Sequence, residues 1–262
     1  MKTTKLFFPL LLSLLFSSLG CSSQAPKQYI GIVSAMDVEI DLLLEKAEIK
    51  ETKVIGHATY HVGKLKGKDV VISKAGIGKI NASSAMTTML SQYDLSKVIF
   101  TGVAGGVKDE ESVLDQVVGT KIVEHDYGYR GNDGFFWCGG DPGLQEPGEY
   151  YECDPGLVNL AYECAIATVK DQRVFKGVIA SGDQFIASTE YVSYLSKEFD
   201  AYACEMEGAA IAKVCQTYGK PFLVMRTLSD KADGLAHASY ADFMDEAGDQ
   251  SSSIVLSMLQ SL

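Results

Sequence analysis

Positive charge is scarce in this sequence of 262 residues. Lys and Arg number 23 against 34 Asp and Glu, which gives a formal net charge of −11. The lysines are scattered singly and form no basic cluster. A surface that binds nucleic acid or an anionic membrane needs clustered positive charge, so we expect neither interaction from the charge of this chain.

Cysteine and histidine are also few, with 6 and 4 residues. There is no Cys-x-x-Cys pair and no His-Glu-x-x-His, so the sequence predicts no metal site. Cys164, Cys204 and Cys215 lie in apolar patterns and are expected in the core. Cys138 and Cys153 flank a stretch rich in glycine and proline, where a disulfide and two free thiols are equal alternatives.

Several common catalytic motifs are missing. There is no Gly-x-Ser-x-Gly, which excludes the nucleophile elbow of serine hydrolases. There is no Gly-x4-Gly-Lys-Ser/Thr, and the glycine run 102–106 lacks the spacing of the dinucleotide fingerprint. The chemistry must therefore come from other side chains.

The N-terminal residues have the pattern of a targeting segment. A short basic start precedes the apolar run 6–16, which is too short to span a bilayer and is typical of a signal-peptide core. Gly20-Cys21 follows and resembles a bacterial lipobox. We expect a signal peptide over 1–20, then a lipidated Cys21 with a tether over 21–27. The protein would then be an exported lipoprotein, anchored to a membrane on the periplasmic face or the cell surface; a plain secretory signal is the alternative.

Residues 28–262 are expected to form one domain. Strand patterns occur over 28–35, 59–62, 69–73, 97–101, 117–123, 174–180 and 221–228, and helical patterns after 78 and over 157–169, 190–198 and 240–262. This alternation predicts an α/β domain with a mixed sheet flanked by helices. The stretch 128–154 is interpreted as a loop, and its Trp137 either borders a ligand or partner, or packs locally.

Three carboxylates stand beside predicted strands and helix starts: Glu39, Glu207 and Asp230. Such positions carry the chemistry of many α/β proteins. Cleavage of a glycosidic bond needs an acid that protonates the leaving group and a carboxylate that activates water. A carboxylate can also accept hydrogen bonds from two vicinal ribose hydroxyls. The set therefore suits a nucleoside as substrate.

Six segments occur in this order: Tyr29–Glu39, Ser73–Lys79, Thr101–Gly106, Ser181–Ile186, Glu205–Ala210 and Arg226–Asp230. Together they resemble the 5'-methylthioadenosine/S-adenosylhomocysteine nucleosidases of the purine nucleoside phosphorylase superfamily. The resemblance covers residues 28–262. It implies a nucleoside phosphorylase-like three-layer α/β/α fold, a homodimer, and release of adenine from 5'-methylthioadenosine, S-adenosylhomocysteine or 5'-deoxyadenosine, with no cofactor.

The resemblance also implies catalytic roles. Asp230, with Ser229 beside it, would protonate adenine N7, and Glu39 would activate water. Glu207 would bind the ribose hydroxyls. Arg226 would lie near the two glutamates, where a salt bridge to either is compatible with its role, while Glu205 receives no role.

The binding residues follow in the same way. The resemblance implies that Phe185 stacks on adenine and that the Ile186 backbone bonds the edge of the base. Met206 would lie over the sugar, and Met36 and Tyr240 would line the pocket for the 5'-substituent.

Two features of the sequence bear on the reaction. Phosphorolysis needs cations near the first strand, but Asp37 and Glu39 stand there and would repel phosphate, so hydrolysis is favoured. Val103 replaces the Ser that the nucleosidases usually carry. The alternative function is a surface lipoprotein that binds nucleosides or a host ligand with weak or no catalysis.

Overall fold

The computed structural model describes residues 27–138 and 149–262. Its main sheet has eleven strands in the order β10-β7-β11-β12-β6-β13-β5-β1-β4-β3-β2. Their bounds are β1 Tyr29–Ser34, β2 Glu48–Ile55, β3 Ala58–Leu65, β4 Lys68–Lys74, β5 Leu95–Phe100, β6 Val103–Gly106, β7 Gln116–Glu124, β10 Tyr150–Glu152, β11 Val174–Ser181, β12 Ala201–Glu205 and β13 Phe222–Asp230.

The sheet is mixed, as predicted. β1 runs parallel to β4 and β5, while β2, β3 and β4 form an antiparallel meander at one edge. β13 is buried along its whole length and pairs with β5, β6 and β7. The β7–β13 pairing closes β7, β11, β12, β6 and β13 into a ring. A strand that is buried on both faces has a continuous run of apolar residues. β13 begins with such a run, which is why the sequence predicted this strand.

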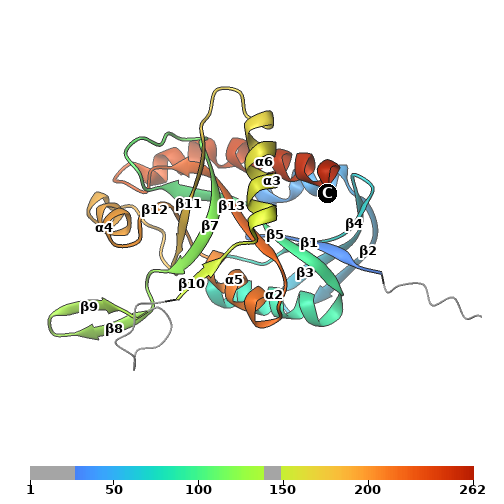
Figure 1. The fold of residues 1–262 in the computed structure, drawn as a ribbon, viewed down its shortest axis with the longest axis horizontal. Helices are drawn as coiled ribbons and strands as arrows, with labels where there is room; N and C mark the ends of the chain where they lie inside the picture. The colour runs from blue at the N-terminus through green and yellow to red at the C-terminus, as the bar shows by residue number, and fades with distance from the viewer. Residues whose placement is uncertain (1–26, 139–148) are drawn as a thin grey trace, which may run out of the picture.

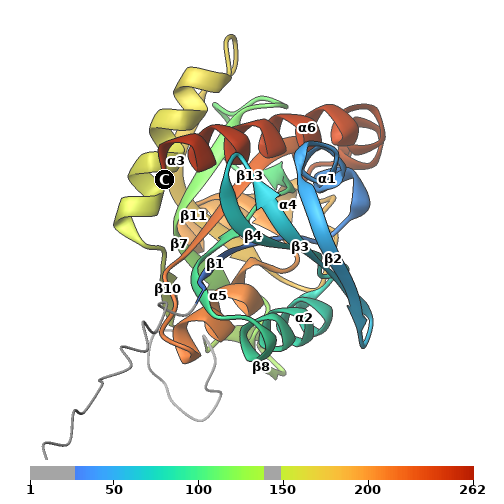
Figure 2. The ribbon, with the colours of Figure 1, turned by 90° about the vertical axis from the view of Figure 1, so that its right-hand side faces the viewer.

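Helices cover both faces of the sheet, which gives the three expected layers. α1, α3 and α6 lie on one side, and α2 and α5 lie on the other (Figures 1 and 2). The helix bounds are η1 Asp37–Glu39, α1 Asp41–Lys46, α2 Lys79–Gln92, α3 Pro155–Thr168, α4 Thr189–Phe199, α5 Gly208–Thr217 and α6 Ala236–Ser261.

Four strands of the sheet were not predicted: β2, β6, β10 and β12. β2 is an edge strand whose residues are almost all exposed, so it carries no apolar alternation. β6 is four residues long and includes two glycines, so its sequence is typical of a turn. β6 is formed by pairing with β12 and β13, which are distant in the sequence, and local propensity does not report that pairing.

The prediction that 128–154 is a loop is wrong for its described residues. They form the hairpin β8 Gly128–Gly131 and β9 Gly134–Trp137, which projects from the body in Figure 1, and part of them forms β10. Trp137 packs on Phe199, with ring centroids 5.0 Å apart, and its Nε1 donates to the carbonyl of Glu124 at 2.6 Å. Of the alternatives for Trp137, local packing is the one observed.

Cysteine positions agree with the expectation for the core. Cys164, Cys204 and Cys215 are buried. Cys138 and Cys153 are free thiols, so the disulfide alternative is not realised. The predicted signal peptide and Cys21 lie outside the described residues. No helix within 27–138 or 149–262 is long and apolar enough to cross a membrane.

Candidate active site

One cavity gathers most of the side chains predicted for the site. Its lining includes these predicted residues: Met36, Glu39, Phe185, Ile186, Met206, Glu207, Ser229, Asp230 and Tyr240. Sheet register brings them together, because Gly105 in β6 pairs with Cys204 of β12 on one side and with Asp230 of β13 on the other. Segments 99 and 125 positions away from Gly105 in the sequence therefore meet at β6.

Glu39 lies in η1, directly after β1, and is buried. Its Oε2 accepts hydrogen bonds from the N–H groups of Ala35 and Met36, both at 2.8 Å, and its Oε1 accepts from Val103 N–H at 2.9 Å. Burial raises the pKa of Glu39, while the Arg226 charge and these three donors oppose that rise. The carboxylate is fixed in place, and its raised pKa makes it a stronger base when ionised.

Gly102 allows this arrangement. A Cβ at this position would overlap the Glu39 carboxylate and would lie 3.3 Å from Arg226 Nη1. Because glycine has no Cβ, the carboxylate and the guanidinium can approach the same point of the backbone.

Glu207 is buried at the start of α5. Its Oε1 accepts a hydrogen bond from Gly78 N–H at 2.7 Å. Burial raises the pKa of Glu207 to about 8, the negative charge of Glu205 adds to the rise, and Arg226 opposes it. Gly78 is a site residue that sequence reasoning missed. The only signal for it was the resemblance of the segment Ser73–Lys79.

Asp230 is the last residue of β13 and is buried. Its Oδ1 accepts from Ala232 N–H at 2.7 Å, and its Oδ2 accepts from the Ser229 hydroxyl at 2.9 Å. Burial raises the pKa of Asp230. A carboxyl group with a raised pKa can hold a proton and donate it to a bound molecule.

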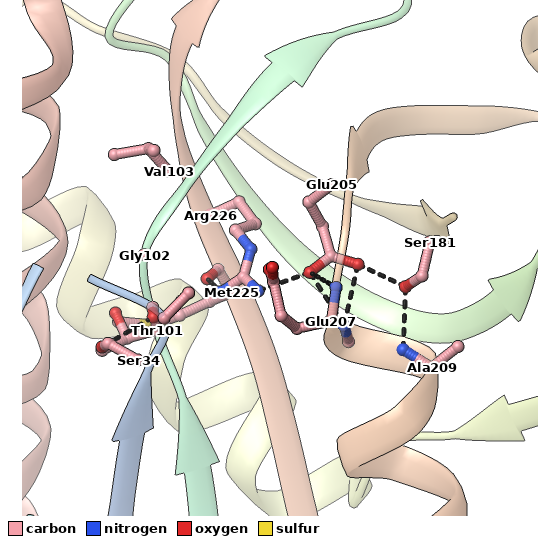
Figure 3. Close-up of polar contacts among 12 residues, drawn as sticks. Ser34, Thr101, Gly102, Val103, Ser181, Glu205, Glu207, Ala209, Met225 and Arg226 are labelled. Carbon is pink, nitrogen blue, oxygen red and sulfur yellow. Dashed lines mark hydrogen bonds and ion pairs between the residues drawn. The ribbon is translucent and has the colours of Figure 1, made fainter. Parts of the chain in front are cut away.

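Arg226 does not pair with Glu39 or Glu207, although both pairings were considered compatible with its role. Its Nη2 binds Glu205 Oε2 at 2.6 Å (Figure 3). Its guanidinium lies over the Phe100 ring at 4.0 Å from the centroid. The Arg226 and Glu205 side chains are each 2% exposed. Glu205, which received no role from the sequence, is therefore a structural acid that is buried and ion-paired, and not a solvated one.

Aromatic side chains form the wall opposite these acids. Phe185 is 42% exposed and stacks on His237, with ring centroids 4.7 Å apart. Tyr240 meets Phe185 edge-on at 5.6 Å, and its hydroxyl lies 3.2 Å from Met36 Sδ. A flat apolar surface thus adjoins the acidic residues, as binding of a planar base requires. Sequence reasoning missed His237.

Within 27–138 and 149–262, no group of three or more His, Cys, Asp and Glu side chains is arranged to hold a metal ion. Among the described residues, no Lys or Arg lines the cavity. The groups in the cavity that can act chemically are therefore carboxyl groups, which have different hydrogen-bond partners and lie beside an apolar wall.

Comparison with known proteins agrees with this site. The profile of the family described as "Phosphorylase superfamily" matches residues 29–260. The 5'-methylthioadenosine/S-adenosylhomocysteine nucleosidase of Bacillus cereus (strain G9842) is 36% identical over 234 residues, which cover 89% of this chain and 99% of the relative.

Two solved structures are similar over almost the same region. The Neisseria meningitidis nucleosidase in complex with methylthio-immucillin-A superimposes with a TM-score of 0.81 at 33% identity, covering 90% of this chain and 100% of that one. A mutant Helicobacter pylori nucleosidase with 5'-methylthioadenosine in its active site gives 0.80 at 33% identity, with the same coverage. The chain therefore belongs to the 5'-methylthioadenosine/S-adenosylhomocysteine nucleosidase family of the phosphorylase superfamily and is, by homology, an N-glycosyl hydrolase.

Proposed function

We propose that this protein hydrolyses the N-glycosidic bond of 5'-methylthioadenosine, S-adenosylhomocysteine or both, and releases adenine; 5'-deoxyadenosine is a further candidate substrate. The observation that carries the proposal is that Glu39, Glu207 and Asp230 are all buried and line one cavity, each with different hydrogen-bond partners. A hydrolase of this kind needs one proton donor, one base and one ligand for the sugar, and three such carboxyl groups can divide these tasks.

Asp230 is the proposed acid. In its neutral form it donates a proton to adenine N7, which draws the electrons of the glycosidic bond into the base, so that adenine leaves uncharged. Asp230 is left ionised, and the bonds from Ala232 N–H and the Ser229 hydroxyl stabilise its charge. Its raised pKa supports the neutral form in the free enzyme.

Glu39 is the proposed base. It takes a proton from a water molecule as the water oxygen bonds to C1' of the sugar, which carries partial positive charge as the base departs. Three backbone donors fix the Glu39 carboxylate before the reaction, so little reorganisation is needed. The products are adenine and the 5'-substituted ribose, which carries the new hydroxyl at C1'.

The other predicted residues bind the substrate in this proposal. Glu207 accepts hydrogen bonds from the ribose hydroxyls, and Met206 lies over the sugar. Phe185 stacks on adenine, whose edge bonds the Ile186 backbone. The apolar group of Met36, Val103 and Tyr240 receives the 5'-substituent.

Water is favoured over phosphate as the nucleophile. In the part of the chain that the structure describes, no Lys or Arg lines the cavity, and the nearby Arg226 is already paired with Glu205. A phosphate ion beside the Glu39 carboxylate would meet negative charge and gain no ion pair from Arg226.

Adenine release from 5'-methylthioadenosine, followed by chromatography with and without inorganic phosphate, tests the proposal. We expect release at the same rate in both buffers and loss of release in Asp230→Asn. Strict dependence on phosphate would identify a phosphorylase. No release by the wild-type protein would leave the alternative, a surface protein that binds a nucleoside or host ligand.

We also propose that the chain is exported and anchored to a membrane through a lipid on Cys21, and that it forms a homodimer. Cys21→Ala is expected to move the protein from the membrane to the soluble fraction. Light scattering of the domain 28–262 measures its mass in solution, and a monomeric mass would contradict the dimer.

A further inference from the structure

Glu205 has more hydrogen bonds than any role as a surface acid would require. Its Oε2 accepts from Arg226 Nη2 at 2.6 Å, from Gly208 N–H at 2.8 Å and from Glu207 N–H at 3.1 Å. Its Oε1 accepts from Gly208 N–H at 2.9 Å and from the Ser181 hydroxyl. Both oxygens are therefore occupied, and Glu205 cannot bind substrate hydroxyls without losing a partner.

These bonds hold the start of α5. The N–H groups of Glu207 and Gly208 donate to Glu205, and Ala209 N–H donates to Ser181 Oγ at 2.8 Å. Register explains the contact between the two acceptors, since Ser181 of β11 pairs directly with Glu205 of β12. N–H groups in the first turn of a helix have no partner within the helix and favour an anion, so this site fixes the helix start.

The same carboxylate holds the cation of the site. Arg226 Nη2 makes its salt bridge to Glu205, Nη1 donates to the Met225 carbonyl at 3.2 Å, and the guanidinium face lies on Phe100. Figure 3 shows the Glu205 carboxylate between the Arg226 guanidinium and the Ser181 hydroxyl. In the described residues, no salt bridge joins Arg226 to Glu39 or Glu207, although both line the cavity together with Glu205.

We propose that Glu205 is a positioning residue for ribose binding: it ties the N-terminus of α5 to Arg226, so that Glu207 faces the cavity fixed in place and free of a cation. Glu207 is the residue just before α5, so its backbone is set by the bonds that Glu205 accepts. A carboxylate without an ion pair keeps its oxygens for the vicinal hydroxyls of the sugar. This inference rests on the proposed role of Glu207 in ribose binding.

Removing the charge of Glu205 has two consequences. Arg226 loses its only salt bridge within the described residues and becomes available to Glu39 and Glu207. The pKa of Glu207 also falls, because the nearby negative charge that raises it is gone while the opposing Arg226 charge remains. The Glu207 carboxylate is then expected to move from its position and to form an ion pair with Arg226.

The test compares ligands with and without a sugar. Binding of 5'-methylthioadenosine and of adenine is measured by calorimetry in an Asp230→Asn background, and KM and kcat are measured as functions of pH in the otherwise wild-type protein. For Glu205→Gln we expect 5'-methylthioadenosine to bind about ten-fold more weakly, the cost of one charge-assisted contact. Adenine, which lacks the sugar, should bind within about two-fold of the parent protein. We also expect KM to rise and the acidic limb of the pH profile of kcat/KM to move to lower pH.

Two further variants keep the inference falsifiable. Ser181→Ala removes one donor to Glu205 without changing charge, and should weaken 5'-methylthioadenosine binding by about three-fold with adenine unchanged. Glu198→Gln, an exposed acid on α4, is the matched control and should change neither ligand. Equal weakening of both ligands, or no weakening of either, in Glu205→Gln and Ser181→Ala would overturn the inference. Absence of adenine release by the wild-type enzyme would instead refute the proposed function, because the binding comparison needs no turnover.

Discussion

Gly78 N–H donates a hydrogen bond of 2.7 Å to Glu207 Oε1, between residues 129 positions apart in the sequence. The next N–H, that of Lys79, donates to Asp183 Oδ1 at 2.8 Å. The N–H groups at the start of α2 thus donate to two carboxylates: Glu207, which lines the cavity, and Asp183, which lies two residues before Phe185. Backbone N–H groups at the start of α2 therefore help to set the position of both carboxylates.

Gly78→Ala tests this relationship. Gly78 has φ of 93°, and a Cβ there would lie 3.2 Å from Asp183 Oδ1, so alanine strains the backbone and shifts the N–H group. We expect the KM for 5'-methylthioadenosine to rise about ten-fold, the loss expected for one hydrogen bond to a charged group. Steady-state kinetics of adenine release measure this change.

Gly67→Ala is the matched control for Gly78→Ala. Gly67 also has a positive φ, 79°, but a Cβ there would meet nothing within 4 Å, and it lies in the β3–β4 turn. Its backbone strain should lower the free energy of unfolding by about 1 kcal/mol, as at Gly78, without changing KM. An equal rise of KM in both variants would show that strain alone, and not the bond to Glu207, is responsible.

The sequence was informative where chemistry follows a single strand or helix start. Glu39 and Asp230 line one cavity, and each was noticed in the sequence because it stands next to a strand with an apolar pattern. The partner of Arg226 could not be predicted, because it depends on the alignment of β12 with β11 and β13. Glu205 and Glu207 are two positions apart, and the sequence does not indicate which of them pairs with the Arg226 guanidinium. Only the register that pairs Ser181 with Glu205 decides this.

The predicted base gives a second test, the variant Glu39→Gln. Both oxygens of Glu39 accept backbone N–H groups, so an amide must place its NH₂ against one of these donors. Loss of the base should reduce kcat by roughly 10²–10⁴-fold. Adenine should still bind, because Phe185 and Asp230 are unchanged. Asp37→Asn, an exposed acid two residues away that pairs with Lys74, should retain full activity; a similar loss there would argue against Glu39 as the base.

Val103 bears on selectivity for the 5'-substituent. Its side chain packs with Leu114 and Ala247 and contributes to the apolar group that includes Met36 and Tyr240. Val103→Ala removes two methyl groups from this wall, which should lower the preference for a methylthio over a hydroxyl substituent by about ten-fold. The ratio of kcat/KM for 5'-methylthioadenosine and adenosine measures this preference.

Val103→Thr separates volume from polarity at the same position. It keeps the shape of valine but adds a hydroxyl, while the backbone N–H that bonds Glu39 remains in both variants. If threonine lowers the preference as much as alanine does, polarity is the cause; if it leaves the preference unchanged, volume is. An unchanged ratio in both variants would remove Val103 from the substrate pocket.

The protonation of Glu207 predicts how stability depends on pH. Burial raises its pKa from 4.5 to about 8, so the folded protein binds this proton more tightly than the unfolded chain does. The resulting stabilisation is complete below pH 4.5 and is lost as pH rises through 8, at up to about 1.4 kcal/mol per pH unit. Glu207→Gln keeps an oxygen that can accept the hydrogen bond from Gly78 N–H, but it cannot ionise. The Tm of this variant should therefore fall less than that of the wild type between pH 6 and pH 9.

Glu111 provides the comparison for this measurement. It is buried outside the lining of the cavity, accepts from the N–H groups of Val107 and Lys108, both at 2.9 Å, and burial raises its pKa to about 7. Glu111→Gln should therefore flatten the lower part of the same curve while adenine release persists. Because the two contributions have the same sign and overlapping ranges, the double variant should show the smallest loss of Tm on going to high pH. If the Tm of Glu207→Gln fell with pH as steeply as that of the wild type, Glu207 would already be ionised in the folded protein. Burial would then not raise the pKa of its carboxyl group.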